Sequence, residues 1–584
     1  MSRSEKFIAL GLLVAAAPMS GAYAQGSTDA AKPAAVCDPY QNYSCLEGYL
    51  NQDGDDPYDR IVNYYKLEWG KAGPPTDPNA PASRRDGWPL TPQTSPPMPF
   101  TEWPYGGTQN LGTTRPASVD SPFMVAVANT WFGKFMASGN MQLYGWIDPG
   151  GNLSTSTQAQ GGNSPAAYDY RPNALNFDQA VMYFERVPDT VQNDHIDWGF
   201  RLSVIYGENY RYTTAYGIQS SQLLTHNNVN GIDYPMEWIE AFIPWIGVGG
   251  TDVRFGRFIS LPDIEAQLAP NNYMYTHSIT YTLDNYTNEG LQFTTGITKN
   301  FFLQYGVTVG TEAAFWHYEK SITNPLPTVS YTDPVTGVAY TNVQNPLYPG
   351  TTIKKDPGAM PSFTGCFRYQ TDDGKNNING CADAINKGTW GYNNLQWYGF
   401  TAYHKFNDKW HVSWEFYEEH QNGVPNLENS TVAGLNSAYG ADGATPFSSL
   451  EGILFNNPGE AYCSGQHNTN QHGAVLSTTA PLTCRATAMG SVAYFNYSPN
   501  ALNNFSIRPE MYYDKNGQRT GTPTHYVDFG LGWQHWLSPQ IEMRPEVTYY
   551  RSLNGPAFNG DSNAGIAPNK AAETVLSGDI ILHF

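Results

Sequence analysis

The sequence predicts an all-β chain that forms a transmembrane, antiparallel up-and-down β-barrel of about 14 strands, with a Pro-rich N-terminal extension. Three observations lead to this fold class. Of 584 residues, 14% are charged, 14% are aromatic and 56 are glycine, which suits strands and turns better than helices. Segments of alternating apolar and polar residues recur from residue 141 to the end of the chain. After residue 24 no apolar run is long enough for a transmembrane helix, so only a closed barrel would carry the chain across a bilayer.

The N-terminal region divides into two predicted parts. Residues 1–24 have the pattern of a signal peptide, with basic Arg3 and Lys6, an apolar core and a small-residue cleavage site that ends at Ala24. Residues 25–120 are predicted to be irregular, because prolines recur too often for a sheet interior or a long helix. The barrel domain is assigned to residues 121–584. Its first stretch, up to Phe135, is compatible with a short amphipathic helix or with a lead-in to the first strand.

The alternating segments define the predicted strands. They lie at residues 141–147, 177–186, 196–206, 237–246, 253–259, 290–298, 303–309, 395–404, 410–416, 491–497, 505–511, 527–534, 541–548 and 576–584. The segment 196–206 has the length that crosses a bilayer at the usual barrel tilt. The strand number has a range of roughly 12 to 18, because boundaries are soft and residues 273–283 are compatible with a further strand.

The connections between these segments alternate between short and long. Six hairpins have short turns, whereas the connections at 207–235, 311–394 and 418–485 are long. Periplasmic turns and extracellular loops of outer-membrane barrels differ in this way, and β-sandwiches or propellers give no reason for it. We therefore expect both ends of the barrel to lie on the short-turn side.

The last strand has one apolar face and one mixed face. Leu582 and Ile580 alternate with His583 and Asp579, and the chain stops at Phe584. A final strand that ends in Phe resembles the closing strand of outer-membrane barrels, and this resemblance implies that Phe584, Leu582 and Ile580 act as an assembly signal. Pairing with the first strand would remove the last open edges of the sheet.

The six cysteines form three locally spaced groups, for which many connectivities are open. In an exported chain we expect three local disulfides that staple loops. The candidate residues are Cys37, Cys45, Cys366, Cys381, Cys463 and Cys484. No C-x-x-C spacing occurs, so no cysteine metal site is predicted.

Several motifs resemble the OmpL-like β-barrel porin family of bacterial outer membranes. The resemblance runs from about residue 120 to the end of the chain. It is carried by Gly139–Asn152, Asp197–Arg201, Tyr206–Arg211, Gly256–Phe258, Glu265, residues 272–278 and 287–290, and the repeated Arg-Pro-Glu near the C-terminus. It implies passive passage of small hydrophilic solutes and gives no defined substrate.

Charged residues on the polar faces of the strands are candidates for lining a pore. They are Arg201, Arg254, Glu415, Arg508, Glu510, Asp528, Glu542, Arg544 and Glu546. In both Arg-Pro-Glu repeats, Arg and Glu lie two residues apart and therefore on one strand face. Opposed charges across a pore set a transverse field and a size limit. The alternative is an ion-pair network that only stiffens the wall.

Composition and motifs also disfavour several classes of function. The net charge of −20 disfavours nucleic acid and anionic surfaces and favours cationic or neutral solutes. No hydrolase, nucleotide-binding or H-E-x-x-H motif is present, so we predict no enzyme, no cofactor and no metal. The acidic stretch at 51–56 departs from the calcium-loop pattern and is interpreted as a turn.

The predicted location is the bacterial outer membrane. Expected partners are its lipid and lipopolysaccharide, the barrel-assembly machinery and small solutes, and a homo-oligomer is compatible with these. A second class of function is a plugged barrel that binds or adheres through its long disulfide-stapled loops. A third class, a soluble exported β-sheet enzyme, would fractionate with the periplasm.

Overall fold

The computed structural model describes thirteen parts of the chain. They are residues 50–51, 53–68, 121–166, 168–190, 192–259, 263–372, 375–407, 409–440, 459–465, 475–500, 502–538, 541–561 and 564–584. The predicted signal peptide, Cys37, Cys45 and most of the Pro-rich segment lie outside these residues, as does part of the acidic stretch 51–56.

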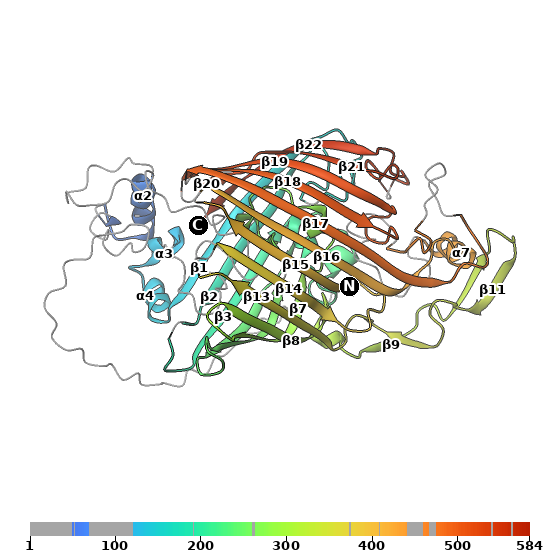
Figure 1. The fold of residues 1–584 in the computed structure, drawn as a ribbon, viewed down its shortest axis with the longest axis horizontal. Coiled ribbons are helices and arrows are strands. Elements are labelled where there is room, and N and C mark those ends of the chain that lie inside the picture. The colour runs from blue at the N-terminus through green and yellow to red at the C-terminus, as the bar shows by residue number, and fades with distance from the viewer. Residues whose placement is uncertain are drawn as a thin grey trace, which may run out of the picture.

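A single antiparallel sheet closes into a barrel of 16 strands (Figure 1). Its strands are β1 (Met141–Ser154), β2 (Leu175–Arg186), β3 (Asp197–Gly207), β5 (Glu237–Ile243), β6 (Thr251–Ile259), β7 (Thr287–Gly296), β8 (Phe301–Thr311), β13 (Ser362–Gln370), β14 (Asn376–Ile385), β15 (Gln396–Lys405), β16 (Trp410–Pro425), β17 (Thr483–Asn500), β18 (Asn503–Asp514), β19 (Thr524–Ser538), β20 (Ile541–Met543) with β21 (Glu546–Ser552), and β22 (Ala572–His583). The segments β20 and β21 form one strand that is interrupted around Pro545, because both pair with β19 and with β22. The short β4 (Gly231–Asp233) pairs with β3 beyond the end of β5.

The first and last strands close the barrel, as the sequence predicted. In the antiparallel register of β1 and β22, Trp146 lies opposite His583 and Leu153 lies opposite Leu576. The backbone of Phe584 extends this pairing, because its N–H donates to Gly145 O at 2.9 Å and Gly145 N–H donates to its carbonyl at 3.0 Å. No sheet edge therefore remains open along the described part of this seam.

The barrel has two more strands than the 14 that the sequence predicted most directly, although 16 lies within its range. The additional hairpin is β13–β14, within the stretch 311–394 that was expected to be one long connection. The alternation of β14 is weak because Asn, Gly and Ala dominate it. Residues 273–283 do not supply a further strand; they contain the short helix α6 (Ile279–Thr282).

This hairpin also corrects the expectation for one disulfide. Cys366 and Cys381 are bonded and lie opposite each other on β13 and β14, so they link two strands of the wall rather than staple a loop. The second bond joins Cys463, in the long connection after β16, to Cys484 near the start of β17. Both observed pairs are the local ones that the spacing favoured.

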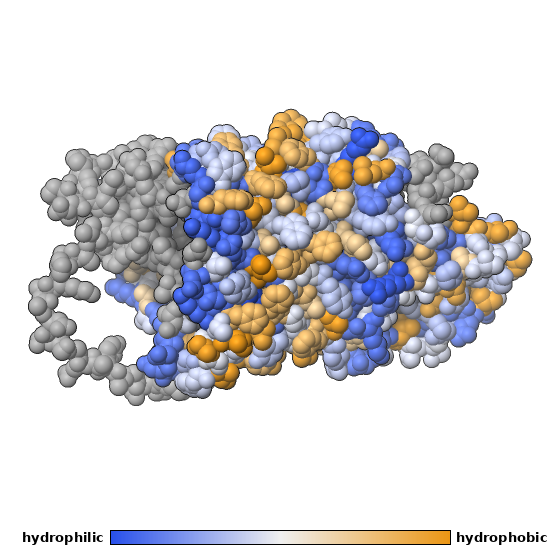
Figure 2. Space-filling view, viewed as in Figure 1, coloured by the Kyte–Doolittle hydropathy of each residue, from blue (hydrophilic) through white to orange (hydrophobic). Residues whose placement is uncertain are grey.

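Apolar side chains cover the outer surface of the wall. Phe529, Leu531 and Trp533 on β19 are exposed, whereas the intervening Asp528, Gly530, Gly532 and Gln534 are buried. Other strands follow the same period of two, and Figure 2 shows hydrophobic residues gathered in a band between two more hydrophilic zones. Such a band matches the hydrocarbon layer of a bilayer.

The two ends of the barrel differ. The short turns, the start of β1 and the C-terminus lie at one end, together with α2 (Pro57–Glu68), α3 (Pro122–Val127) and α4 (Trp131–Ser138) (Figure 1). Residues 122–135 are thus mostly helical, the first of the two alternatives considered. The helix α2 lies within the stretch 25–120 that was expected to be irregular. None of the described helices is long and apolar enough to cross a membrane.

The opposite end carries the long loops. The connection between β8 and β13 forms two small sheets, β9 (Ser321–Thr323) with β12 (Thr352–Lys354) and β10 (Thr328–Thr332) with β11 (Ala339–Gln344). The helix α7 (Ser430–Tyr439), from the loop after β16, packs on β10, and Ser430 Oγ donates to Asp333, the residue after β10, at 2.6 Å. This end of the molecule is therefore a folded cap rather than a set of separate loops.

Candidate pore and the segment inside it

A connection between β6 and β7 lies inside the barrel. We call residues 263–286 the inner segment; it contains a short 3-10 turn, η5 (Ala269–Asn271), and α6. Every residue from 267 to 290 is buried. The charged residues of the inner segment are confined to its two ends, and Thr, Tyr, Asn and Ser dominate the stretch between them. A buried connection needs partners for its backbone groups, and the inner face of the wall supplies them.

Two wall carboxylates accept hydrogen bonds from the inner segment. Glu510 on β18 accepts from the backbone N–H groups of Ile279 and Thr280 and from the Thr280 hydroxyl. These N–H groups belong to the first turn of α6, where a helix leaves its donors without intrahelical partners. Glu546 on β21 accepts from Thr276 N at 3.0 Å and from the Thr276 hydroxyl.

Two wall arginines donate to carbonyl groups of the same segment. Arg508 Nη1 donates to Thr276 O at 2.6 Å, and Arg544 Nη1 donates to Ala269 O at 2.5 Å. Arg544 also forms an ion pair with Asp579 on β22, and Arg508 lies 3.8 Å from Asp528 on β19. Both Arg-Pro-Glu motifs thus hold the inner segment through Arg and Glu together.

The remaining predicted pore residues contact partners on the wall. Arg201 donates to Glu185 at 2.6 Å, and Arg254 donates to Glu240 at 2.9 Å. Both guanidinium groups also lie against the Trp238 ring, at 4.8 and 4.1 Å from its centroid. Glu542, near the end with the short turns, accepts from Gln534 at 2.6 Å and lies 3.2 Å from His583.

All nine predicted residues thus lie on the buried inner face of the wall. Their exposed fractions range from 0% for Arg508 and Glu542 to 6% for Arg254, Glu510 and Asp528. Five of them contact the inner segment, the fifth being Glu415, which accepts from Ile264 N at 2.7 Å. At the level of the inner segment, these charged groups contact protein instead of water. The inner segment therefore narrows the lumen there.

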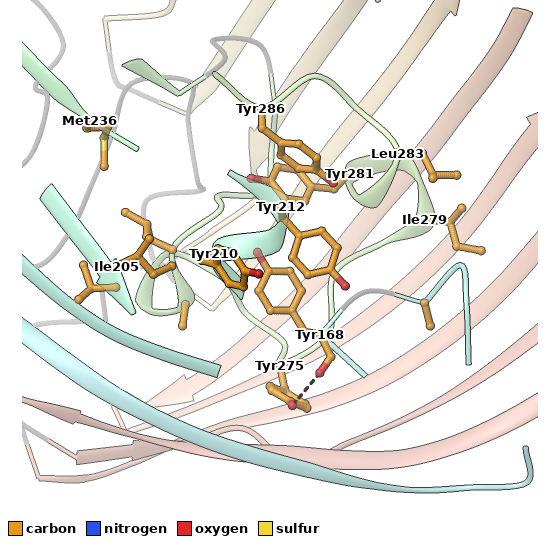
Figure 3. Packing of buried hydrophobic residues seen from close by; sticks show 14 of the residues in the cluster. Tyr168, Ile205, Tyr210, Tyr212, Met236, Tyr275, Ile279, Tyr281, Leu283 and Tyr286 are labelled. Atoms are coloured by element: carbon orange, nitrogen blue, oxygen red, sulfur yellow. Dashed lines mark hydrogen bonds between the residues drawn. The ribbon is translucent and has the colours of Figure 1, made fainter. Parts of the chain in front are cut away.

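A group of tyrosines packs between the wall and the inner segment (Figure 3). Tyr168 stacks on Tyr212 with ring centroids 5.1 Å apart, and Tyr275 donates a hydrogen bond to the Tyr168 carbonyl at 2.9 Å. Tyr281 and Tyr286 approach from the end of the inner segment. The lumen thus holds aromatic surface as well as charge.

One buried carboxyl outside the membrane-spanning strands has a strongly shifted pKa. Glu312 follows the last residue of β8 and is 1% exposed. Its Oε2 accepts from Asn393 Nδ2 at 3.0 Å, and Asn393 in turn accepts from Arg519 at 3.2 Å. Burial raises the pKa of Glu312 to about 8, because the charged form loses its hydration, and the bond from Asn393 offsets part of this rise.

Sequence reasoning missed several residues of this site. Glu185, Glu240 and Asp579, the partners of the wall arginines, lie on the polar faces of predicted strands and were detectable by the same alternation. The tyrosines Tyr417, Tyr512 and Tyr550 also lie on inner faces, where they occupy polar positions of the pattern. The inner segment itself carried no signal for its location, because a loop sequence does not specify which wall it contacts.

Solved porin structures resemble this chain at low similarity. An anion-selective porin from Comamonas acidovorans is 11% identical, with a TM-score of 0.40, and the match covers 76% of this chain and 99% of that chain. The outer membrane channel DcaP of Acinetobacter baumannii is 8% identical, with a TM-score of 0.39 and coverages of 76% and 97%. A triple mutant of the Rhodopseudomonas blastica porin is 10% identical, with a TM-score of 0.33 and coverages of 76% and 100%.

No curated protein matches the chain. The family model described as "Putative beta-barrel porin-2, OmpL-like" matches residues 140–584, which extend from the residue before β1 to the C-terminus. The match covers more than half of the sequence, and the chain therefore belongs to this porin family.

Proposed function

We propose that the protein is an exported outer-membrane porin through which small hydrophilic solutes diffuse passively, along a charged lumen narrowed by the inner segment. The observation that carries this proposal is the closed barrel whose outer face is apolar and whose inner face is charged. An apolar band outside suits lipid, and a polar interior suits water and solutes. The net charge of −20 favours cations or neutral solutes over anions.

The inner segment determines which solutes this channel is expected to pass. A pore bounded by hydrogen-bonded backbone and fixed guanidinium and carboxylate groups selects by size and by local charge. We therefore expect a low single-channel conductance compared with that of an open barrel of the same strand number. No catalytic role is proposed, since the charged groups of the lumen serve as wall and segment contacts.

Planar-bilayer recordings test the proposal. Protein purified in detergent, and shown to be folded by its heat-modifiable migration on a gel, should produce stable conductance steps, and boiled protein should produce none. A steady current whose reversal potential in a salt gradient indicates cation preference would support the proposed selectivity. Folded protein that inserts without any conductance would exclude passive passage.

A second function is favoured by one observation. The residues from 267 to 290 are all buried, so the barrel interior is densely packed at this level. A plugged barrel would serve binding or adhesion, and the folded cap of β9–β12 and α7 would be the surface involved. Absence of conductance in folded, inserted protein, together with binding that is lost when the cap is removed, would favour this function.

A further inference from the structure

Three carboxylates meet inside the barrel at the two ends of the inner segment. Asp263 lies at its start, Asp284 lies near its end, and Glu415 lies on the inner face of β16. One carboxylate oxygen from each residue lies within 4.8 Å of the others. Their side chains are buried, with exposed fractions of 6%, 0% and 1%.

Each of these carboxylates keeps one buried oxygen that no hydrogen-bond donor of the described chain reaches. The atoms are Asp263 Oδ1, Asp284 Oδ2 and Glu415 Oε1. Backbone groups bind other oxygens of the cluster: Ile264 N donates to Glu415 Oε2 at 2.7 Å, and Asn285 N donates to Asp284 Oδ1 at 2.6 Å. The side chains of Glu415 and Asp284 are thus held in place, while one oxygen of each of the three carboxylates remains without a donor. A buried, unpartnered carboxylate oxygen is costly unless a proton or a cation satisfies it.

The charged side chains around the cluster do not provide this compensation. Arg508 lies 3.8 Å from Asp528, and Arg519 lies 3.2 Å from Glu419. Glu265 is satisfied by Ser278 and Tyr494, and Asp383 accepts hydrogen bonds from Thr364, Asn285 and Asn288. The surroundings are therefore rich in acid, and Arg508 and Arg519 have other carboxylate partners.

The ligand chemistry of the cluster selects a hard divalent cation. Carboxylate oxygens suit Ca²⁺ and Mg²⁺, and the cluster has no sulfur or imidazole ligand that would favour softer metals. Ca²⁺ binds oxygen at about 2.4 Å, so two ligands on opposite sides of the ion are about 4.8 Å apart. Water would complete its flexible coordination shell, whereas Mg²⁺ demands a stricter octahedron.

We propose that Asp263, Asp284 and Glu415 bind one Ca²⁺ ion, which fastens both ends of the inner segment to strand β16. The two positive charges of the ion offset most of the repulsion among the three carboxylates, and the ion closes a loop of chain inside the barrel. Its removal would leave the ends of the segment attached to the wall by fewer contacts. The proposal concerns binding and segment stability, and it holds whether or not solutes pass through the lumen.

Calorimetric titration of the folded protein with CaCl₂ tests the site. After treatment with EDTA and removal of the chelator, we expect the wild type to bind one Ca²⁺ ion per chain at this site. The double variant Asp284→Asn/Glu415→Gln should bind Ca²⁺ at least about 10- to 100-fold more weakly than the wild type. Changes to residues that only support the metal ligands already cost this much affinity, and here two ligands are changed. The matched control is Glu573→Gln, at another buried inner carboxyl, whose bond is to Ser156.

Thermal unfolding gives a second measurement on the same proteins. Ca²⁺ should raise the unfolding temperature of the wild type and of the control, because it binds only the folded site, and it should not raise that of the double variant. Heat-modifiable migration on a gel shows whether each variant is folded. If the double variant does not fold, the single variant Asp284→Asn replaces it in both measurements.

Two results would overturn the proposal. One is folded wild-type protein that binds no Ca²⁺ at neutral pH, which would mean that the carboxyl groups are protonated instead. The other is binding of equal affinity and stoichiometry in the wild type and in the cluster variant.

Discussion

At the scale of single residues, the contacts of Glu510 and Arg544 give the first prediction. Each holds the backbone of the inner segment. Replacement of Glu510 by Ala removes the acceptor of the buried Ile279 and Thr280 N–H groups, and replacement of Arg544 removes a donor to Ala269 O and the ion-pair partner of Asp579. We expect Glu510→Ala and Arg544→Ala each to change single-channel conductance or ion preference, with more frequent open-channel fluctuations. Glu573→Ala, which removes an inner carboxyl that bonds Ser156, is the control. Unchanged conductance in both variants would leave these residues a structural role only.

Glu312 provides a second residue-scale prediction, on pH. Its pKa is about 8 in the folded protein and near 4.5 when the chain is unfolded. Between these values the folded state holds a proton that the unfolded state releases, so the contribution of Glu312 to stability falls as the pH rises from about 5 to 8. Glu312→Gln keeps a polar partner for Asn393 and removes the titration. Its unfolding temperature should therefore vary less than that of the wild type between pH 5 and 8, and a slope equal to that of the wild type would contradict this assignment.

At the scale of elements, the β13–β14 hairpin is fastened by the Cys366–Cys381 disulfide within the wall. The two cysteines are 15 residues apart in the sequence. In the chain-entropy model, a disulfide that closes a loop of this length adds about 3 kcal/mol to the free energy of unfolding. Cys366→Ser/Cys381→Ser should therefore lower the temperature at which the folded band disappears on a gel, while the barrel still assembles. The pair Cys463→Ser/Cys484→Ser, which links the loop after β16 to the start of β17, is the comparison and should affect the barrel less. Equal melting of the wild type and the wall variant would show that strand pairing alone sets the stability of this hairpin.

The same hairpin shows how far the sequence predicts the elements. Strands such as β3 and β19 were predictable because alternation with a period of two is local to a few residues. In β14 the Asn and Gly residues weaken this pattern, so the pairing with its neighbours decides the structure. The nine inner-face charges were predictable from the faces of their strands. The path of the inner segment was not, because the contact between Thr280 and Glu510 joins residues 230 positions apart.

At the scale of the whole molecule, Phe584 takes part in the seam that closes the barrel. Phe584 pairs through its backbone with Gly145, and its ring lies over that glycine, where an added Cβ would be 2.7 Å from the ring. Leu582 and Ile580 face outward on the same strand. The seam between β1 and β22 thus combines backbone hydrogen bonds with packing of the Phe584 ring against Gly145. A side chain at residue 145 would clash with this ring.

Deletion of Phe584 should therefore impair assembly more than selectivity. We expect the amount of folded, heat-modifiable protein in the outer-membrane fraction to fall several-fold, because the seam loses its terminal contacts and the strand loses its aromatic end. Those barrels that do assemble should keep the ion preference of the wild type, since Phe584 carries none of the lumenal charges. Phe529→Ala, which removes an exposed aromatic from the middle of the wall, is the control for a general loss of lipid contact. Normal insertion of the truncated chain would exclude an assembly role for the C-terminal residue.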